Sequence, residues 1–74
     1  MTLIGKVLKK QVAKGSKSEH NAVILVTNDR EFNLRRLGGN AFQDDILDSL
    51  IDQEITAHGT IHNYTFIMNN WTIN

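Results

Sequence analysis

The stretch EITAHGTIH, residues 54–62, alternates between two kinds of side chain at every position. Ile55, Ala57, Gly59 and Ile61 occupy one row, and the intervening row is polar. Because a period of two places successive side chains on opposite faces of a β-strand, the pattern predicts a strand with one buried face. The glycine in the buried row indicates a bend or a close approach of another backbone.

Other parts of the chain also have the composition of β-strands. Gly5 predicts a bulge in the first of them. Asn28-Asp29 predicts a tight turn that pairs the second strand with the third as a hairpin. In the third strand, Phe32 and Leu34 share the buried face. These predicted strands cover residues 3–12, 22–27, 31–37, 64–68 and 71–73, with an interruption at 69–70.

After Gly38-Gly39 the apolar residues recur at the spacing of an amphipathic helix. Asn40 has the side chain of a helix N-cap, and Gln43 follows at the spacing of a capping box. The pattern therefore predicts a short helix over residues 41–51. Its apolar face contains Phe42, Ile46, Leu47, Leu50 and Ile51, and its solvated face contains Asp44, Asp45, Asp48 and Asp52.

The composition restricts the chemistry that the chain can perform. Its 74 residues suffice for one small domain, 1–74. It has no cysteine, which excludes disulfides, thiol nucleophiles and thiolate metal sites. Its serines lie outside nucleophile motifs, so we expect no enzyme activity, no catalytic residue and no cofactor. The longest apolar run, residues 22–26, is too short to span a bilayer, and we expect a soluble, cytoplasmic protein without a membrane partner.

Two histidines of the polar row, His58 and His62, are candidate metal ligands. They are four residues apart, which separates their Cα atoms by about 13 Å in an extended strand. A single zinc ion with bonds of about 2.0 Å cannot easily accept both. We therefore expect surface histidines and no metal site.

The net charge of zero conceals an asymmetry along the chain. Residues 1–36 hold eight basic and three acidic residues, a net charge of +5, whereas residues 37–74 hold five acidic and no basic residues, a net charge of −5. Such segregation can produce the basic face of a polyanion binder. In a small barrel the two halves interleave and their charges can also pair, so the sequence leaves both interpretations open.

Gly5 in the first strand, the Asn28-Asp29 turn, the helix capped from Asn40 and the stretch at 54–62 follow one another in a single pattern along nearly the whole chain. This order of three strands, a helix and two strands resembles the OB-fold. In that fold the helix between strands three and four closes one end of a five-stranded Greek-key barrel. The resemblance implies an all-β fold class with one short helix, the five-stranded Greek-key OB-fold barrel. An SH3-like barrel and other small α+β folds are the alternatives.

The resemblance also implies a place for a binding site. The OB-fold uses the face of strands two and three and the loops that join strands one to two and four to five. Single-strand binders of this fold combine a basic groove with aromatic rings on which bases stack. We therefore expect weak, non-enzymatic binding of single-stranded DNA or RNA, with Tyr64 stacking on a base. The expected phosphate contacts are Lys9, Lys10, Lys14, Lys17, Arg30, Arg35 and Arg36.

A protein-interaction module is the alternative function. The barrel would then dock on a protein partner, or form a homodimer through its first or last strand. Exposed Val12, Leu37 or Trp71 would form the contact. An oligosaccharide binder would instead expose Trp71 beside polar side chains. A contiguous basic face favours nucleic acid, and an apolar patch of several hundred Å² favours a protein partner.

Overall fold

The structure of the protein is a computed structural model, which describes residues 1–12, 20–39 and 44–74. The prediction of a mostly β chain with five strands and one short helix is confirmed, and the fourth strand has the bounds that its alternation predicts. The elements in chain order are β1 (Thr2–Val12), β2 (His20–Val26), β3 (Glu31–Arg36), α1 (Asp45–Ser49), β4 (Glu54–His62) and β5 (Thr65–Ile73).

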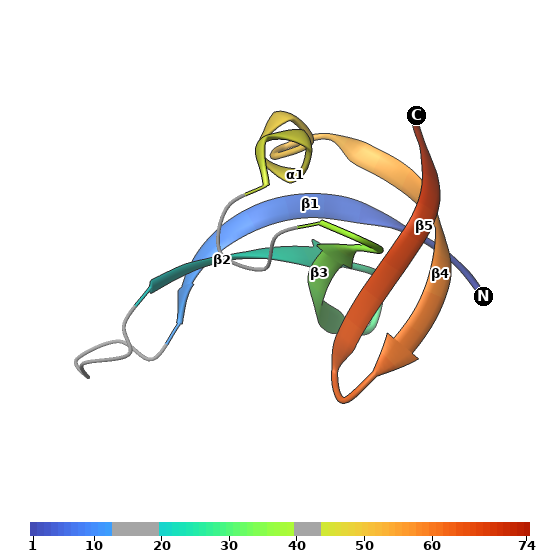
Figure 1. The fold of residues 1–74 in the computed structure, drawn as a ribbon, viewed down its shortest axis with the longest axis horizontal. Helices are drawn as coiled ribbons and strands as arrows, with labels where there is room; N and C mark the ends of the chain where they lie inside the picture. Colours follow the sequence, from blue (N-terminus) through green and yellow to red (C-terminus); the bar gives the residue numbers. More distant parts are fainter. Residues whose placement is uncertain (13–19, 40–43) are drawn as a thin grey trace.

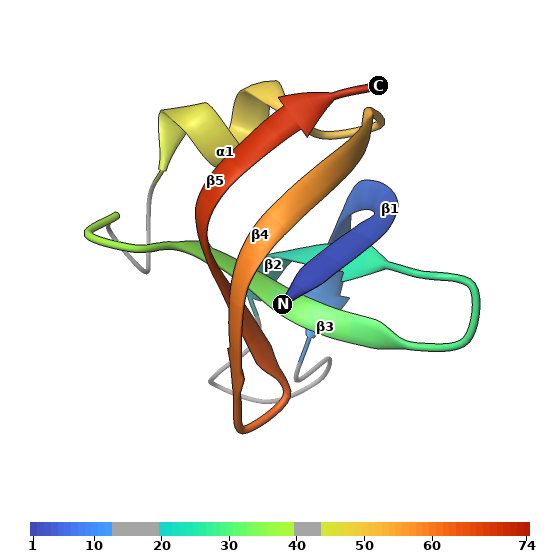
Figure 2. The same cartoon turned by 90° about the vertical axis from the view of Figure 1, so that its right-hand side faces the viewer.

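The five strands form one sheet that closes on itself (Figure 1). Residues 6–12 of β1 pair with β2, and residues 2–6 pair with β4. Since β1 pairs on both sides, the order β1-β2-β3-β5-β4 returns to its start as a closed barrel. Neighbouring strands are antiparallel except β3 and β5, which are parallel. Figures 1 and 2 show α1 at one end of the barrel and the β4–β5 turn at the other.

The interior of the barrel is apolar. Phe32 and Leu34 of β3 are both buried, as their alternation predicts. In β4 the predicted inward row is buried except for Ile61, which is 38% exposed because it lies at the end of the strand beside the β4–β5 turn. The buried cluster consists of Val7, Leu25, Phe32, Leu34, Leu47, Leu50, Ile55, Ala57, Phe66 and Met68.

The β-bulge lies in β5, and the prediction of a bulge at Gly5 is wrong. His58 pairs with Asn70, whereas the next residue, Gly59, pairs with Met68. Asn69 is therefore an extra residue, and the predicted interruption is a bulge within a continuous β5. Gly5 keeps a continuous register with β4 and instead permits the close approach of another backbone.

The helix begins later than predicted. Its N-cap is Asp44, whose extended backbone precedes the helix and whose carboxylate accepts hydrogen bonds from the backbone N–H groups of Ile46 and Leu47. The predicted N-cap, Asn40, lies outside the described residues. The observed helix has five residues, Asp45–Ser49, so the predicted span of 41–51 is too long for the part that is described.

The buried side of α1 is narrower than the predicted apolar face. Leu47 and Leu50 are buried against the core, but Ile46 is 43% exposed. Phe42 and Gln43 lie outside the described residues. Leu47 and Leu50, together with the partly buried Ile51, carry the observed packing of this segment on the barrel.

Candidate functional site

The outward rows of three adjacent strands form the surface that we call the outer face. Its β3 row is polar and exposed, whereas its β2 row is apolar. The register aligns these rows, because Leu8, Ile24 and Asn33 are neighbours across the three strands. The outer face consists of Lys6, Leu8, Lys10, Ala22, Ile24, Val26, Glu31, Asn33 and Arg35.

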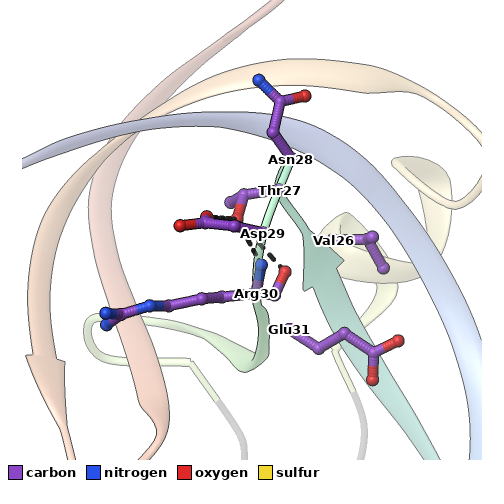
Figure 3. A pocket seen from close by; sticks show the side chains of 6 residues that line it. All are labelled: Val26, Thr27, Asn28, Asp29, Arg30 and Glu31. Atoms are coloured by element: carbon purple, nitrogen blue, oxygen red, sulfur yellow. Dashed lines mark hydrogen bonds between the residues drawn. The ribbon is translucent and has the colours of Figure 1, made fainter.

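The described basic residues do not all lie on the outer face. Lys6, Lys10 and Arg35 belong to it, and Lys6 is not among the predicted phosphate contacts. Lys9 lies on the opposite side of β1 from Lys10, because side chains alternate along a strand. Arg30 points away from Glu31 at the β2–β3 turn (Figure 3). The predicted contacts Lys14 and Lys17 lie outside the described residues.

A salt bridge connects the two edges of the outer face. The Nζ of Lys10 in β1 donates to both carboxylate oxygens of Glu31 in β3, at 3.1 and 3.0 Å. Because β2 lies between β1 and β3, the pair passes over the apolar row of β2. Lys10 is therefore held by a carboxylate of the same face, whereas Arg35 is exposed and forms no ion pair within the described part of the chain.

A second ion pair binds the end of β3 to the start of α1. The Nε of Arg36 donates to both carboxylate oxygens of Asp44, at 3.1 and 2.9 Å. The guanidinium carbon also lies 6.0 Å from the centre of the Trp71 ring. The side chain of Asp44 is only 5% exposed, so its predicted place on the solvated face of the helix is wrong. The side chain of Arg36 is half-buried and bound to this carboxylate, and its predicted phosphate contact stays a prediction.

The surroundings of Asp44 change the acidity of its carboxyl group. Burial raises the pKa of Asp44, but the hydrogen bond and the charge of Arg36 and the N–H groups of Leu47 and Ile46 lower it more. The net result is a pKa below the ordinary value of 3.8. The ionised form of this side chain is therefore the one that the fold stabilises.

This lowered pKa predicts the direction of acid destabilisation. The Asp44 carboxylate stabilises the fold at pH values above 3.8, and its contribution is lost as the pH falls through the lower folded pKa. We expect the free energy of unfolding to fall less steeply between about pH 4 and pH 2 in Asp44→Asn than in the original protein. Urea titrations followed by the fluorescence of Trp71 measure both slopes. Equal slopes would contradict the assignment.

The β4–β5 turn presents an aromatic ring to solvent. Asn63 and Tyr64 have positive φ angles of 47° and 64°, as the two central residues of a type I′ hairpin turn do. Tyr64 is 82% exposed, and it belongs to the turn and not to the following strand as predicted. Its carbonyl oxygen accepts a hydrogen bond from the backbone N–H of Asn33, which places the turn beside the β3 row of the outer face.

An open hollow of about 460 Å³ lies at the β2–β3 turn (Figure 3). The hydroxyl of Thr27 accepts a hydrogen bond from the N–H of Arg30 and lies 3.3 Å from a carboxylate oxygen of Asp29. These contacts, with the bond from the Thr27 N–H to the Arg30 carbonyl, account for the shape of the turn. The hollow is the open side of this turn, and we assign no ligand to it.

The two histidines of β4 contact different neighbours. The Nδ1 of His58 is 2.8 Å from the Thr2 hydroxyl, and the Nε2 of His62 is 3.4 Å from the amide nitrogen of Asn63. Among the described residues, no three histidine or carboxylate side chains are placed to hold a metal ion. No helix in the described ranges is long and apolar enough to cross a membrane.

Comparisons with known proteins found no relative of this chain. No family model matches it, and neither a curated protein nor a solved structure matches it. The outer face and the β4–β5 turn are therefore the features of this chain that bear on its function.

Proposed function

We propose that the chain is an OB-type barrel domain that binds single-stranded DNA or RNA and performs no catalysis. The strand order β1-β2-β3-β5-β4 supports this assignment, because it is the order of a five-stranded Greek-key barrel of that type. The place of α1 in the chain, between β3 and β4, also agrees with the OB pattern. The binding face of such a barrel lies on strands two and three, which here carry most of the outer face.

Tyr64 is the observation that carries the proposed function. A large ring that is 82% exposed loses the stability that burial would provide. Its φ of 64° adds a cost of about 1–3 kcal/mol that glycine would avoid. Because neither the exposure of the ring nor its positive φ stabilises the fold, both favour a role in binding a ligand. An exposed tyrosine beside a polar strand row provides a surface on which a base can stack.

Arg35 supplies a positive charge on the strand that the β4–β5 turn adjoins. It lies in the same outward row of β3 as Asn33, whose N–H binds the Tyr64 carbonyl. If Arg35 bound a phosphate and Tyr64 stacked on a base of the same strand, that strand would lie along the outer face. With one ring and few exposed cations we expect micromolar or weaker affinity, carried mainly by phosphate contacts.

The protein-interaction alternative receives less support from the positions of its residues. Leu37 is 69% exposed, but Trp71 is half-buried and packs against the core. The side chain of Val12 lies outside the described set. The same position of Trp71 disfavours an oligosaccharide site built on that ring.

Fluorescence anisotropy of a labelled strand of about 15 nucleotides tests the proposed function. Titrations at about 50 and 200 mM salt should give a log–log slope of about −2 to −4, which corresponds to three to five neutralised phosphates. A strand that does not bind at 50 mM salt, with the protein near 100 μM, would rule the proposal out.

Replacing Tyr64 with glycine should change stability and binding in opposite directions. Loss of the stacking surface should weaken binding by about tenfold. Relief of the positive φ, partly offset by the greater backbone entropy that glycine loses on folding, should raise the free energy of unfolding by up to about 1 kcal/mol. Tyr64→Phe is the matched control, since it keeps the ring and should bind within about twofold of the original protein. Unchanged binding by Tyr64→Gly would remove the ring from the site.

A further inference from the structure

Ile24 is the one buried residue of the outer face, where its neighbours Leu8, Ala22 and Val26 are partly buried and Asn33 is exposed. It belongs to the outward row of β2, yet it is only 5% exposed. In the register, Lys10 pairs with Ala22 and Glu31 pairs with Val26. A bridge from Lys10 to Glu31 therefore runs diagonally across β2, and Ile24 lies midway between the two ends. The ion pair thus crosses the outer face at the position of this buried isoleucine.

The pair itself lies at the surface. The side chains of Lys10 and Glu31 are 55% and 53% exposed. Exposed pairs of this kind contribute little to stability and are screened by salt. An anion that also makes other contacts on the outer face can therefore displace the Glu31 carboxylate from the lysine without unfolding the barrel.

We propose that Lys10, Ile24 and Glu31 form a closed nucleotide subsite, in which the Glu31 carboxylate occupies the place of a phosphate. Opening the pair would present an ammonium group for a phosphodiester and the apolar surface of Ile24 for a sugar or base. This inference rests on the proposed function. It adds that the outer face restrains its own affinity, because one of its cations is already bound to an acid.

The chemistry of the subsite favours a nucleic-acid strand as the displacing ligand. A phosphodiester supplies the negative charge that Lys10 would lose, in a charge-assisted hydrogen bond. The attached sugar and base supply an apolar surface for Ile24. An inorganic anion satisfies only the first requirement, so phosphate ions alone should not open the subsite effectively.

Glu31→Gln tests the inference, because it preserves the size of the side chain and removes its charge. Anisotropy titrations with the labelled single strand at about 50 mM salt should show binding about fivefold tighter than that of the original protein. The salt slope should become steeper by about 0.7, the value for one additional phosphate on a single strand.

Asp29→Asn is the matched control. Asp29 is an exposed acid on the adjacent β2–β3 turn, and within the described residues it forms no ion pair. Its replacement changes the net charge by the same amount as Glu31→Gln. At the same salt concentration it should change the affinity by less than about twofold, with no change of slope.

Lys10→Gln, made in the original protein and in the Glu31→Gln variant, isolates the effect of the Lys10–Glu31 pair on affinity. In the original protein Lys10 is already bound, so the substitution should change affinity by less than about twofold. In the Glu31→Gln background it should remove the whole gain, about fivefold.

The outcomes separate the subsite from the proposed function. The subsite is overturned if Glu31→Gln and Asp29→Asn bind the strand with equal affinity. It is also overturned if Lys10→Gln lowers the affinity equally in both backgrounds. In either case, binding of the strand by the original protein still supports the proposed function. If neither the original protein nor Glu31→Gln binds the strand, both proposals fail. Urea unfolding of each variant verifies that the barrel is folded.

Discussion

Replacing Gly59 with alanine should destabilise the protein by about 3 kcal/mol or more, which lowers the melting temperature by roughly 15 °C. A Cβ at this position would overlap the carbonyl oxygen of Ile67 and lie 2.7 Å from the Cα of Met68. Both are backbone atoms of β5 and cannot rotate away, so the β4–β5 pairing must separate at the bulge. Thermal unfolding followed by circular dichroism measures the loss.

Gly38→Ala is the control for the Gly59 experiment. Gly38 has a φ of +79°, but a Cβ there would meet no atom within 4 Å. Its replacement should cost only about 1 kcal/mol, from the backbone conformation. If Gly59→Ala costs no more than Gly38→Ala, the two strands are not as close at the bulge as the structure shows.

Asp44→Ala should cost about 2–4 kcal/mol. It removes the N-cap of α1, which contributes about 1 kcal/mol. It also leaves the half-buried guanidinium of Arg36 without its carboxylate, and loss of one partner from a shielded ion pair is expensive. Because Arg36 lies over Trp71, the fluorescence of that ring should report both the altered environment and the lower midpoint in urea.

Asp44→Asn divides this cost into two parts. Asparagine caps a helix about as well as aspartate, so this variant should lose the ion pair and keep the cap. Its destabilisation should be smaller than that of the alanine variant by about 1 kcal/mol. Identical losses in the two variants would show that Asp44 acts only through Arg36.

The strands could be predicted where one face is buried. The alternation at 54–62 predicts the bounds of β4, and that of Phe32 and Leu34 predicts the buried side of β3. The exposure of Ile61 could not be predicted from its row, because it arises from the position of this residue beside the β4–β5 turn. The bulge could not be placed either, since it depends on how β5 pairs with β4.

The helix start was misplaced for a physical reason. Several side chains between residues 38 and 46 can cap a helix, and local spacing favours Asn40 with Gln43. Asp44 becomes the cap because it also pairs with Arg36, a residue of another element. The spacing of residues along the chain does not indicate that contact.

Of the candidate site, the sequence indicated the ring of Tyr64 and the cation of Arg35. It placed Tyr64 at the start of a strand, since a tyrosine with positive φ is uncommon and composition favours β structure there. It also counted Lys10 and Arg36 among the expected phosphate contacts, and in the fold each of them forms an ion pair with a carboxylate.

By itself the sequence determined which segments are strands and which of their faces are apolar. Side chains alternate between the two faces of a strand, and this alternation is visible in consecutive residues. The tertiary structure alone decided which charges are available to a ligand. Glu31 reaches Lys10 across an intervening strand, and Asp44 reaches Arg36 from another element. An ion pair depends on the distance between two groups in space. Strand pairing brings together groups that are far apart in the sequence, so a local sequence pattern does not indicate that they are close.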